Sequence, residues 1–166
     1  MSGGESGGAA RWPEPTVRLE SRTGWRLRLP DGSLFLEEPS SGPGTEQISL
    51  PGDILLTLIP DDRVGHLGQV LEWSQHQAQR FVTDRGGELV AEGSIPSAGT
   101  AYACLVGFAG HTADRWIVAS VGLLRDAAFL GLLILWPVTD PAMEPDLTLV
   151  RRVVNAVGTG GPDGAG

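Results

Sequence analysis

The first part of the chain alternates between apolar and polar residues with a period of two, which is typical of half-buried strands. The alternation covers residues 16–37 and is broken at Arg22–Gly24 and at Pro30–Gly32, where the residues favour turns. Its apolar positions are Val17, Leu19, Trp25, Leu27, Leu29, Leu34 and Leu36. We therefore predict short strands joined by tight turns, then a loop at Ser40–Gly44 and a nearly uniform apolar strand at Asp53–Ile59.

The next segment changes to a helical period. Apolar and small residues recur at Leu67, Val70, Leu71, Ser74, Ala78, Phe81 and Val82. This spacing predicts an amphipathic helix that ends at Gly86–Gly87, because glycine is common just past a helix C-terminus. Asp61 and Asp62 lie just upstream, and negative charge is favourable near a helix N-terminus.

Four further strands and a closing helix are predicted in the second half of the chain. The strands are Glu88–Glu92, Thr100–Ala109, Arg115–Leu124 and Phe129–Trp136. The last three are joined by short connections, which make neighbouring strands antiparallel. The closing helix is marked by Leu147, Val150, Val153, Val154 and Val157, with Gly158 as its expected stop. This order predicts an α+β fold, with a large antiparallel β-sheet flanked by two α-helices.

The long strands are apolar on both faces, whereas a sheet covered on one side should have one polar face. In the last strand, Phe129, Leu133 and Leu135 point one way. Leu130, Leu132, Ile134 and Trp136 point the other way. Two helices of the chain, one on each side, would provide the cover. The second face could instead meet the N-terminal strands, a second subunit or a client protein.

Three glycines lie inside predicted strands, at Gly107, Gly122 and Gly131. Such glycines usually mark bulges or the close approach of another group. Pairing that is symmetric about His111–Thr112 would place Gly107 opposite Trp116, with the indole lying over the bare glycine. A groove for a partner is the alternative interpretation.

Length and charge limit the classes of protein that fit. The chain has 166 residues and a formal net charge of −8, with twelve basic residues that are all arginine. The length suits a single domain, predicted at residues 16–157 between Gly-rich tails at 1–15 and 158–166. The acidic balance argues against a nucleic-acid partner or a polybasic membrane anchor.

No membrane span and no secretory signal are predicted. The apolar stretch from Trp116 to Trp136 is divided near its middle by Arg125 and Asp126, where a charge would cost about 3 kcal/mol in a bilayer. We interpret that stretch as a hairpin. Residues Met1–Ala10 hold no basic residue and no apolar run, which indicates a cytoplasmic protein.

The sequence contains no recognisable catalytic motif, and we predict no metal, no cofactor and no enzymatic activity. Its histidines, His66, His76 and His111, are scattered over different predicted elements. Asp61 and Asp62 together with His66 could form an acid–base cluster, but helix capping explains the acidic pair. The single cysteine, Cys104, lies in an apolar strand and is expected to be a buried core residue.

Five residues are candidates for a binding surface. Arg18, Arg26 and Arg28 share the outward face of the N-terminal strands, where they could receive an acidic peptide or a carboxylate, or simply be solvated. Trp73 lies on the flank of the apolar stripe of the first helix. It would be partly exposed for an interface, or packed at the edge of the core. Trp116 could line a groove or pack on Gly107.

The organisation resembles the PsbP/DcrB-like superfamily, an α/β sandwich, over residues 16–157. The stretches that carry the resemblance are Gly24–Trp25, Ile54–Ile59, Leu67–Phe81, Ser97–Phe108, Trp116–Leu124 and Leu147–Val157. Its members are generally non-catalytic, and they include photosystem extrinsic subunits, bacterial lipoproteins and Eag chaperones that shelter apolar segments of type VI secretion effectors. The chain lacks the lipobox of the lipoproteins, so the resemblance implies the cytoplasmic chaperone or adaptor branch.

We therefore expect a non-enzymatic cytoplasmic adaptor or chaperone-like protein, with a link to secretion, that binds another protein through its sheet face or a groove. One alternative is a small enzyme or ligand-binding domain whose polar groups, such as Asp61, Asp62, His66 or His111, converge in three dimensions. The other is a structural homodimer whose apolar sheet faces pack together.

Overall fold

A computed structural model describes residues 12, 14–37, 44–112, 114–139 and 147–158. The predicted tails, apart from Trp12, Glu14, Pro15 and Gly158, lie outside these residues, as does most of the Ser40–Gly44 loop. The N-terminal elements are β1 (Thr16–Glu20), β2 (Arg26–Pro30), β3 (Leu34–Phe35), β4 (Glu46–Leu50) and β5 (Ile54–Pro60). They are followed by α1 (Leu67–Arg85), β6 (Glu88–Ser94), β7 (Thr100–Ala109), β8 (Arg115–Arg125), β9 (Ala128–Val138), α2 (Leu147–Ala156) and β10 (Val157–Gly158).

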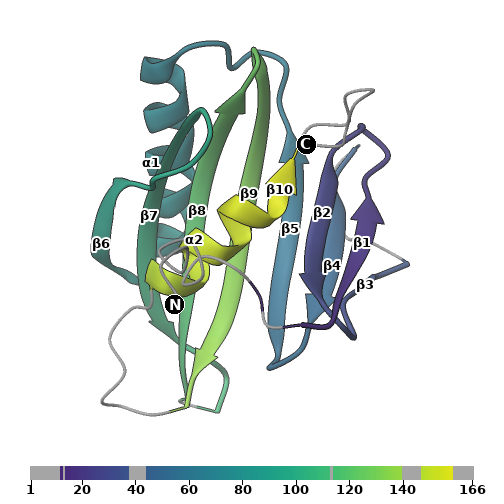
Figure 1. The fold of residues 1–166 in the computed structure, drawn as a ribbon. Coiled ribbons are helices and arrows are strands. Elements are labelled where there is room, and N and C mark those ends of the chain that lie inside the picture. Colours follow the sequence, from purple (N-terminus) through teal and green to yellow (C-terminus); the bar gives the residue numbers. More distant parts are fainter. Residues whose placement is uncertain (1–11, 13, 38–43, 113, 140–146, 159–166) are drawn as a thin grey trace, which may run out of the picture.

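The strands form two antiparallel sheets (Figure 1). The larger sheet has seven strands in the order β3-β4-β5-β9-β8-β7-β6, and the smaller has three in the order β1-β2-β10. The apolar stretch between Trp116 and Trp136 forms the β8–β9 hairpin, as expected. The fold class predicted from the sequence is confirmed: two helices flank a large antiparallel sheet. No helix in the described residues is both long and apolar enough to cross a membrane.

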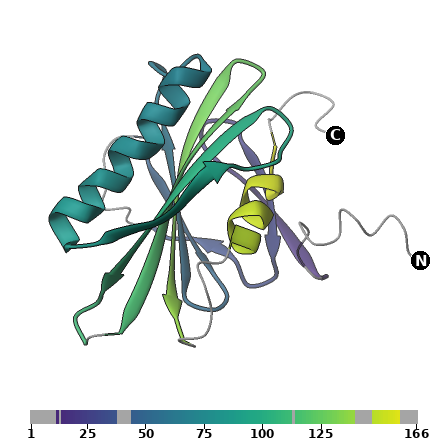
Figure 2. The ribbon, with the colours of Figure 1, turned by 90° about the vertical axis from the view of Figure 1, so that its left-hand side faces the viewer.

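Each face of the seven-stranded sheet carries a helix of the chain (Figure 2). Figure 2 shows α1 on one side of this sheet and α2 on the other. The side of α2 also carries the three-stranded sheet, which lies in front of β4 and β5 in Figure 1. The main core fills the space between these layers and includes Leu29 on β2, Leu132 on β9 and Val153 on α2, all with zero exposure. The apolar second face of the strands is therefore used largely for intramolecular packing.

Two strand glycines let α1 approach the sheet closely. Gly122 on β8 and Gly131 on β9 are direct cross-strand partners. A Cβ atom on Gly122 would lie 2.9 Å from the Cγ1 atom and from the carbonyl oxygen of Val70. The Trp73 indole lies over Gly131, where a Cβ atom would overlap the ring. The expectation of close approach at these two glycines is confirmed, and the approaching group is a helix of the same chain.

The register of the β7–β8 hairpin differs from the expected one. Trp116 is paired with Phe108 and Gly107 with Ile117, so the indole does not lie opposite the glycine. The pairing is therefore shifted by one residue from the expected register. The Gly110 N–H donates to the Asp114 carbonyl at 2.7 Å and closes a turn that is wider than assumed. Because one residue of slip reverses every face assignment, the packing proposed for Trp116 on Gly107 is wrong. The Arg115 side chain lies against Gly107 instead.

The segment boundaries differ from prediction at several other points. The strand Glu46–Leu50 was not predicted, because only Ile48 and Leu50 mark its alternation. The closing helix ends at Ala156 rather than Val157, because Val157–Gly158 turn into a strand that pairs with Leu27 and Arg26. At the other end, Trp12 packs against the main core although it falls in the predicted tail.

Candidate binding surfaces

Part of the sheet face on the side of α1 carries no helix in the described chain. The helix lies over β6, β7 and β8, and it leaves the β5, β4 and β3 side of this face uncovered (Figure 1). Strand pairing places one row of side chains across it, namely Leu135 on β9, Leu55 on β5, Ser49 on β4 and Leu34 on β3. The same row continues under α1 as Val118 and Val106, which are buried.

We call this area the open half-face and define it by Leu34, Ser49, Leu55 and Leu135. Ile59 and Leu133 border it, and they pack against the cluster that includes Val70 and Trp73 of α1. Its exposure grows with distance from α1. Leu135 and Leu55 are half-buried, whereas Leu34 on the edge strand is 54% exposed. Since a helix shields the buried end of the row, the open half-face is a continuation of the core layer that the described helices do not cover.

Trp116, one of the predicted binding residues, lies at one end of the same face. It is half-buried beside Pro137, its cross-strand partner on β9. Its indole Nε1 donates to Oδ2 of Asp114 at 2.7 Å, and the Thr112 hydroxyl donates to Oδ1 at 2.6 Å. These two hydrogen bonds, first that of Thr112, lower the pKa of Asp114. The indole lies against Gly110, and the ring packs against the buried cluster that includes Phe108 and Val118.

Trp73, the other predicted aromatic contact, is only 8% exposed. It forms an edge-on pair with Phe129, with ring centroids 5.3 Å apart, and packs on Gly131. The interpretation of Trp73 as an exposed interface residue is therefore wrong, and the packed alternative holds. The space left by Gly131 accounts for the difference.

The three predicted arginines are brought together on the outer face of the three-stranded sheet. Arg18 is the direct cross-strand partner of Arg28, and Arg26 lies two residues along β2, opposite Glu20. All three arginines are exposed, while the alternate residues Leu27 and Leu29 are buried. The outward orientation predicted for these side chains is confirmed. Their role in binding stays a prediction.

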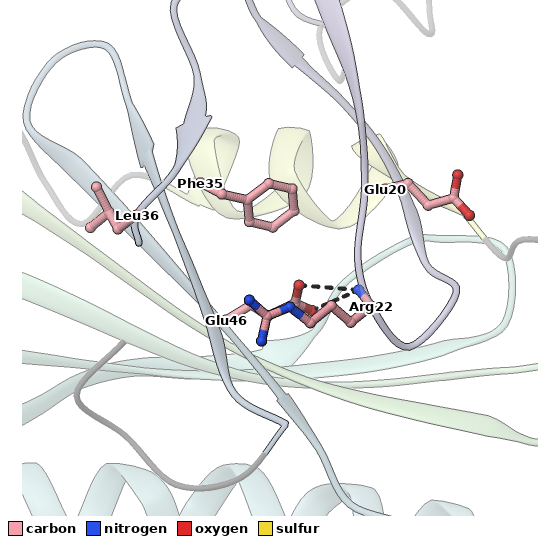
Figure 3. A pocket seen from close by; sticks show the side chains of 5 residues that line it. All are labelled: Glu20, Arg22, Phe35, Leu36 and Glu46. Atoms are coloured by element: carbon pink, nitrogen blue, oxygen red, sulfur yellow. Dashed lines mark hydrogen bonds between the residues drawn. The ribbon is translucent and has the colours of Figure 1, made fainter. Parts of the chain in front are cut away.

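A small hollow opens between the ends of the two sheets, with a volume of about 210 Å³ (Figure 3). The hairpin of β1 and β2 contributes Glu20 and Arg22, and Phe35, Leu36 and Glu46 line the opposite side. Both carboxylate oxygens of Glu46 accept hydrogen bonds from the backbone N–H of Arg22, at 3.1 and 3.2 Å. The hollow is smaller than the ~300 Å³ at which sites for small organic ligands begin. We interpret the Glu46 carboxylate as a structural contact that links the β1–β2 hairpin to the large sheet.

The acidic pair before the first helix has a different role from the one predicted. His66 is the N-cap of α1, and the first turn holds no acidic residue. Asp61 instead accepts hydrogen bonds from the Arg63 guanidinium at 2.9 and 3.0 Å and from its backbone N–H at 3.0 Å. The Arg63 side chain thereby lowers the pKa of Asp61. The capping interpretation is wrong, because the pair lies several residues before the helix starts.

The remaining titratable groups do not converge on one place. The described residues contain no group of three or more His, Cys, Asp or Glu side chains placed to hold a metal ion. The Tyr102 hydroxyl donates to Oε2 of Glu92, and this hydrogen bond, together with burial, raises the pKa of Tyr102 to about 12. Cys104 is buried, and burial raises the pKa of its thiol.

The sequence missed the leucines of the open half-face. A signal was present, because the strand at Ile54–Pro60 is apolar on both faces and thus requires cover on both. The unpredicted strand β4, with Gln47 and Ser49 on the open side, was needed to place them.

Comparison with known proteins identifies the fold. No family model matches the chain, and no curated protein matches its sequence. The solution structure of a cyanobacterial PsbP (CyanoP) from Synechocystis is similar, with a TM-score of 0.62 and 10% identity, over 89% of this chain and 94% of that chain. LpqN of Mycobacterium tuberculosis, described as involved in cell envelope biogenesis, gives a TM-score of 0.45 and 15% identity, over 85% and 87% of the two chains. The chain has the PsbP-like fold.

Proposed function

We propose that this chain is a non-catalytic adaptor or chaperone-like protein, which binds an amphipathic helix of another protein on the open half-face. The observation that supports this proposal is the row Leu135–Leu55–Ser49–Leu34, whose apolar members become exposed where α1 no longer covers them. Apolar surface of this kind gains about 25 cal/mol per Å² when it is removed from water.

The width of the open half-face suits one helix. Adjacent strands lie about 4.8 Å apart, so the four strands from β9 to β3 span about 14 Å. A helix with its side chains is about 10 Å in diameter. A second helix could therefore lie beside α1 and complete the layer, with its apolar side on Leu55 and Leu34.

The use of the polar groups supports binding rather than catalysis. Asp61 pairs with Arg63, Asp114 holds Trp116, and Glu92 accepts from Tyr102, so each is engaged in a local contact. The resemblance to secretion chaperones, which shelter apolar segments, gives the proposal its link to secretion. The cytoplasmic location is part of the same proposal.

The test is a titration with labelled, leucine-rich amphipathic helices of about 18 residues, which would span about 27 Å. Fluorescence anisotropy would measure binding to the wild-type chain, to Leu34→Glu and to Leu89→Glu. Both leucines are exposed, 54% and 45%, and both lie on outer strands of the large sheet. They also share the α1 face, because Leu34 aligns with Ser49 and Leu89 with Val106.

The proposal predicts that Leu34→Glu weakens binding about tenfold or more, since burying a leucine contributes about 1.5–3 kcal/mol. Leu89→Glu, on the far side of α1, should leave the affinity within about twofold. Equal losses in the two variants, or no saturable binding of any helix in the panel, would contradict it.

A homodimer is the second candidate, because a second copy could cover the same exposed leucine on β3. It is distinguished by the mass of the protein in solution.

A further inference from the structure

Strand β1 has an open edge. It is the outermost strand of the order β1-β2-β10 and lies at the outer side of the smaller sheet in Figure 1. Two hydrogen bonds fix which residues face that edge. The Ser21 N–H donates to the Trp25 carbonyl at 2.8 Å, and the Asp31 N–H donates to the Pro15 carbonyl at 3.2 Å.

Antiparallel pairs alternate between hydrogen-bonded and non-hydrogen-bonded positions. Ser21 and Pro15 belong to hydrogen-bonded pairs, so every second residue between them, namely Leu19 and Val17, does so as well. These two residues direct their backbone N–H and C=O groups to β2. Thr16, Arg18 and Glu20 therefore direct their N–H and C=O groups away from β2. The open edge offers three consecutive sites for pairing with another strand.

The same edge carries an unusual placement of positive charge. Arg18 and Arg28 form a non-hydrogen-bonded pair, the closer of the two pair types, with Cα atoms about 4.5 Å apart. Like charges directly opposite destabilise a sheet. Among the described residues, no carboxylate lies within 4.0 Å of either guanidinium. The hairpin of residues 16–30 holds four arginines and one glutamate in a chain of net charge −8.

We propose that an extended acidic segment of a partner protein adds to β1 as a further strand of the small sheet. Its backbone would pair with Thr16, Arg18 and Glu20, and one carboxylate would lie beside Arg18, within reach of the Arg28 guanidinium. Strand addition gives affinity through backbone hydrogen bonds and specificity through alternate side chains. Residues between the acidic ones would face inward, beside Val17 and Leu19, and would be small and apolar.

Protection against aggregation is the alternative explanation for charge on an edge strand. Arg18 alone would serve that purpose, since it lies at the middle of β1. Protection does not require a second arginine directly opposite on the interior strand β2, where it only adds repulsion. A bound carboxylate would turn this repulsion into attraction.

The test uses a labelled peptide of about eight residues with alternating valine and glutamate, and a matched peptide with glutamine in place of glutamate. Anisotropy would be measured for the wild-type chain, for the double variant Arg18→Gln/Arg28→Gln and for Arg80→Gln. Arg80 is an exposed arginine on α1 and serves as the charge-matched control.

We expect the acidic peptide to bind, the double variant to lose about tenfold in affinity, and Arg80→Gln to change it less than twofold. Two further peptides, each methylated on one alternate set of backbone nitrogens, separate strand addition from simple charge attraction. One of the two sets should abolish binding. Leu34→Glu should have no effect, because this site is independent of the open half-face.

Equal binding of the glutamine peptide, or full binding of both methylated peptides, would overturn the proposal. So would a double variant that binds like the wild-type chain. Tighter binding to anionic lipid vesicles than to the acidic peptide, lost in the double variant, would assign the arginines to phosphate recognition and would also overturn it.

Discussion

Ser74 on α1 and Ser120 on β8 each donate a hydrogen bond to the other's backbone carbonyl. The Oγ atom of Ser74 lies 2.6 Å from the Ser120 oxygen, and the Oγ atom of Ser120 lies 2.7 Å from the Ser74 oxygen. Both residues are buried, with exposures of 0% and 1%. The reciprocal pair satisfies two hydroxyls inside an apolar layer and fixes the helix against the strand.

Removal of either hydroxyl should destabilise the protein. Ser74→Ala and Ser120→Ala are each expected to lower the free energy of unfolding by about 1–1.5 kcal/mol, the usual contribution of an intramolecular hydrogen bond. The double variant should lose less than the sum, by about 0.5 kcal/mol or more, because the two bonds share one geometry. Urea denaturation measures these values.

Ser49→Ala is the control, because Ser49 lies half-buried on the same sheet face in the open half-face. It should change the free energy of unfolding by less than about 0.5 kcal/mol. Strict additivity of Ser74→Ala and Ser120→Ala would show that the two hydrogen bonds act independently.

The Trp73 indole packs directly over Gly131, in space that a side chain at this position would occupy. Gly131→Ala should destabilise the protein by about 1–3 kcal/mol, because the new methyl group overlaps the indole and overpacks the layer. Gly93→Ala on β6, where a Cβ atom would meet nothing within 4 Å, should be close to neutral. Thermal denaturation of the two variants provides the comparison.

A second substitution makes this prediction specific. If the clash is with the indole, Trp73→Leu combined with Gly131→Ala should cost less than the sum of the single substitutions. If the changes in the free energy of unfolding are fully additive, the strain in Gly131→Ala does not come from contact with the Trp73 indole.

Tyr102 is the only tyrosine, so its titration can be followed by ultraviolet absorbance. The hydrogen bond to Glu92, followed by burial, raises its pKa from 10.0 to about 12. The folded state thus holds the proton more tightly than the unfolded state. The resulting contribution to stability is complete below pH 10 and is lost as the pH rises from about 10 to about 12.

Glu92→Gln should return the Tyr102 pKa toward 10, because an amide does not repel the phenolate. The loss of stability between pH 10 and 12 should shrink with it. An unchanged titration in this variant would mean that burial dominates.

The local pattern predicted most strands and both helices, since period-two and helical spacing depend on neighbouring residues. It also predicted that the long strands need cover on both faces, and Leu130 and Leu133 lie on opposite sides as expected. Strand β4 was missed because the first of its core-facing positions is a glutamate, Glu46, which is buried and accepts hydrogen bonds from the Arg22 backbone N–H.

The errors at the candidate site have long-range causes. For Trp73, the sequence left an exposed interface position and a packed position both open, because its burial depends on Gly131, a residue far along the chain on another element. The position of Trp116 depended on one residue of register in the β7–β8 turn, which composition does not determine. The open half-face could not be predicted, because the spacing of apolar residues within α1 does not show which strands the helix covers.

Light scattering after size exclusion, at two concentrations and with a dye that reports exposed apolar surface, tests the adaptor proposal most directly. We predict a monomer near 17.5 kDa that binds the dye, with binding reduced in Leu34→Glu and retained in Leu89→Glu. A stable dimer that binds no dye would contradict the proposal, because a second copy would already cover the open half-face.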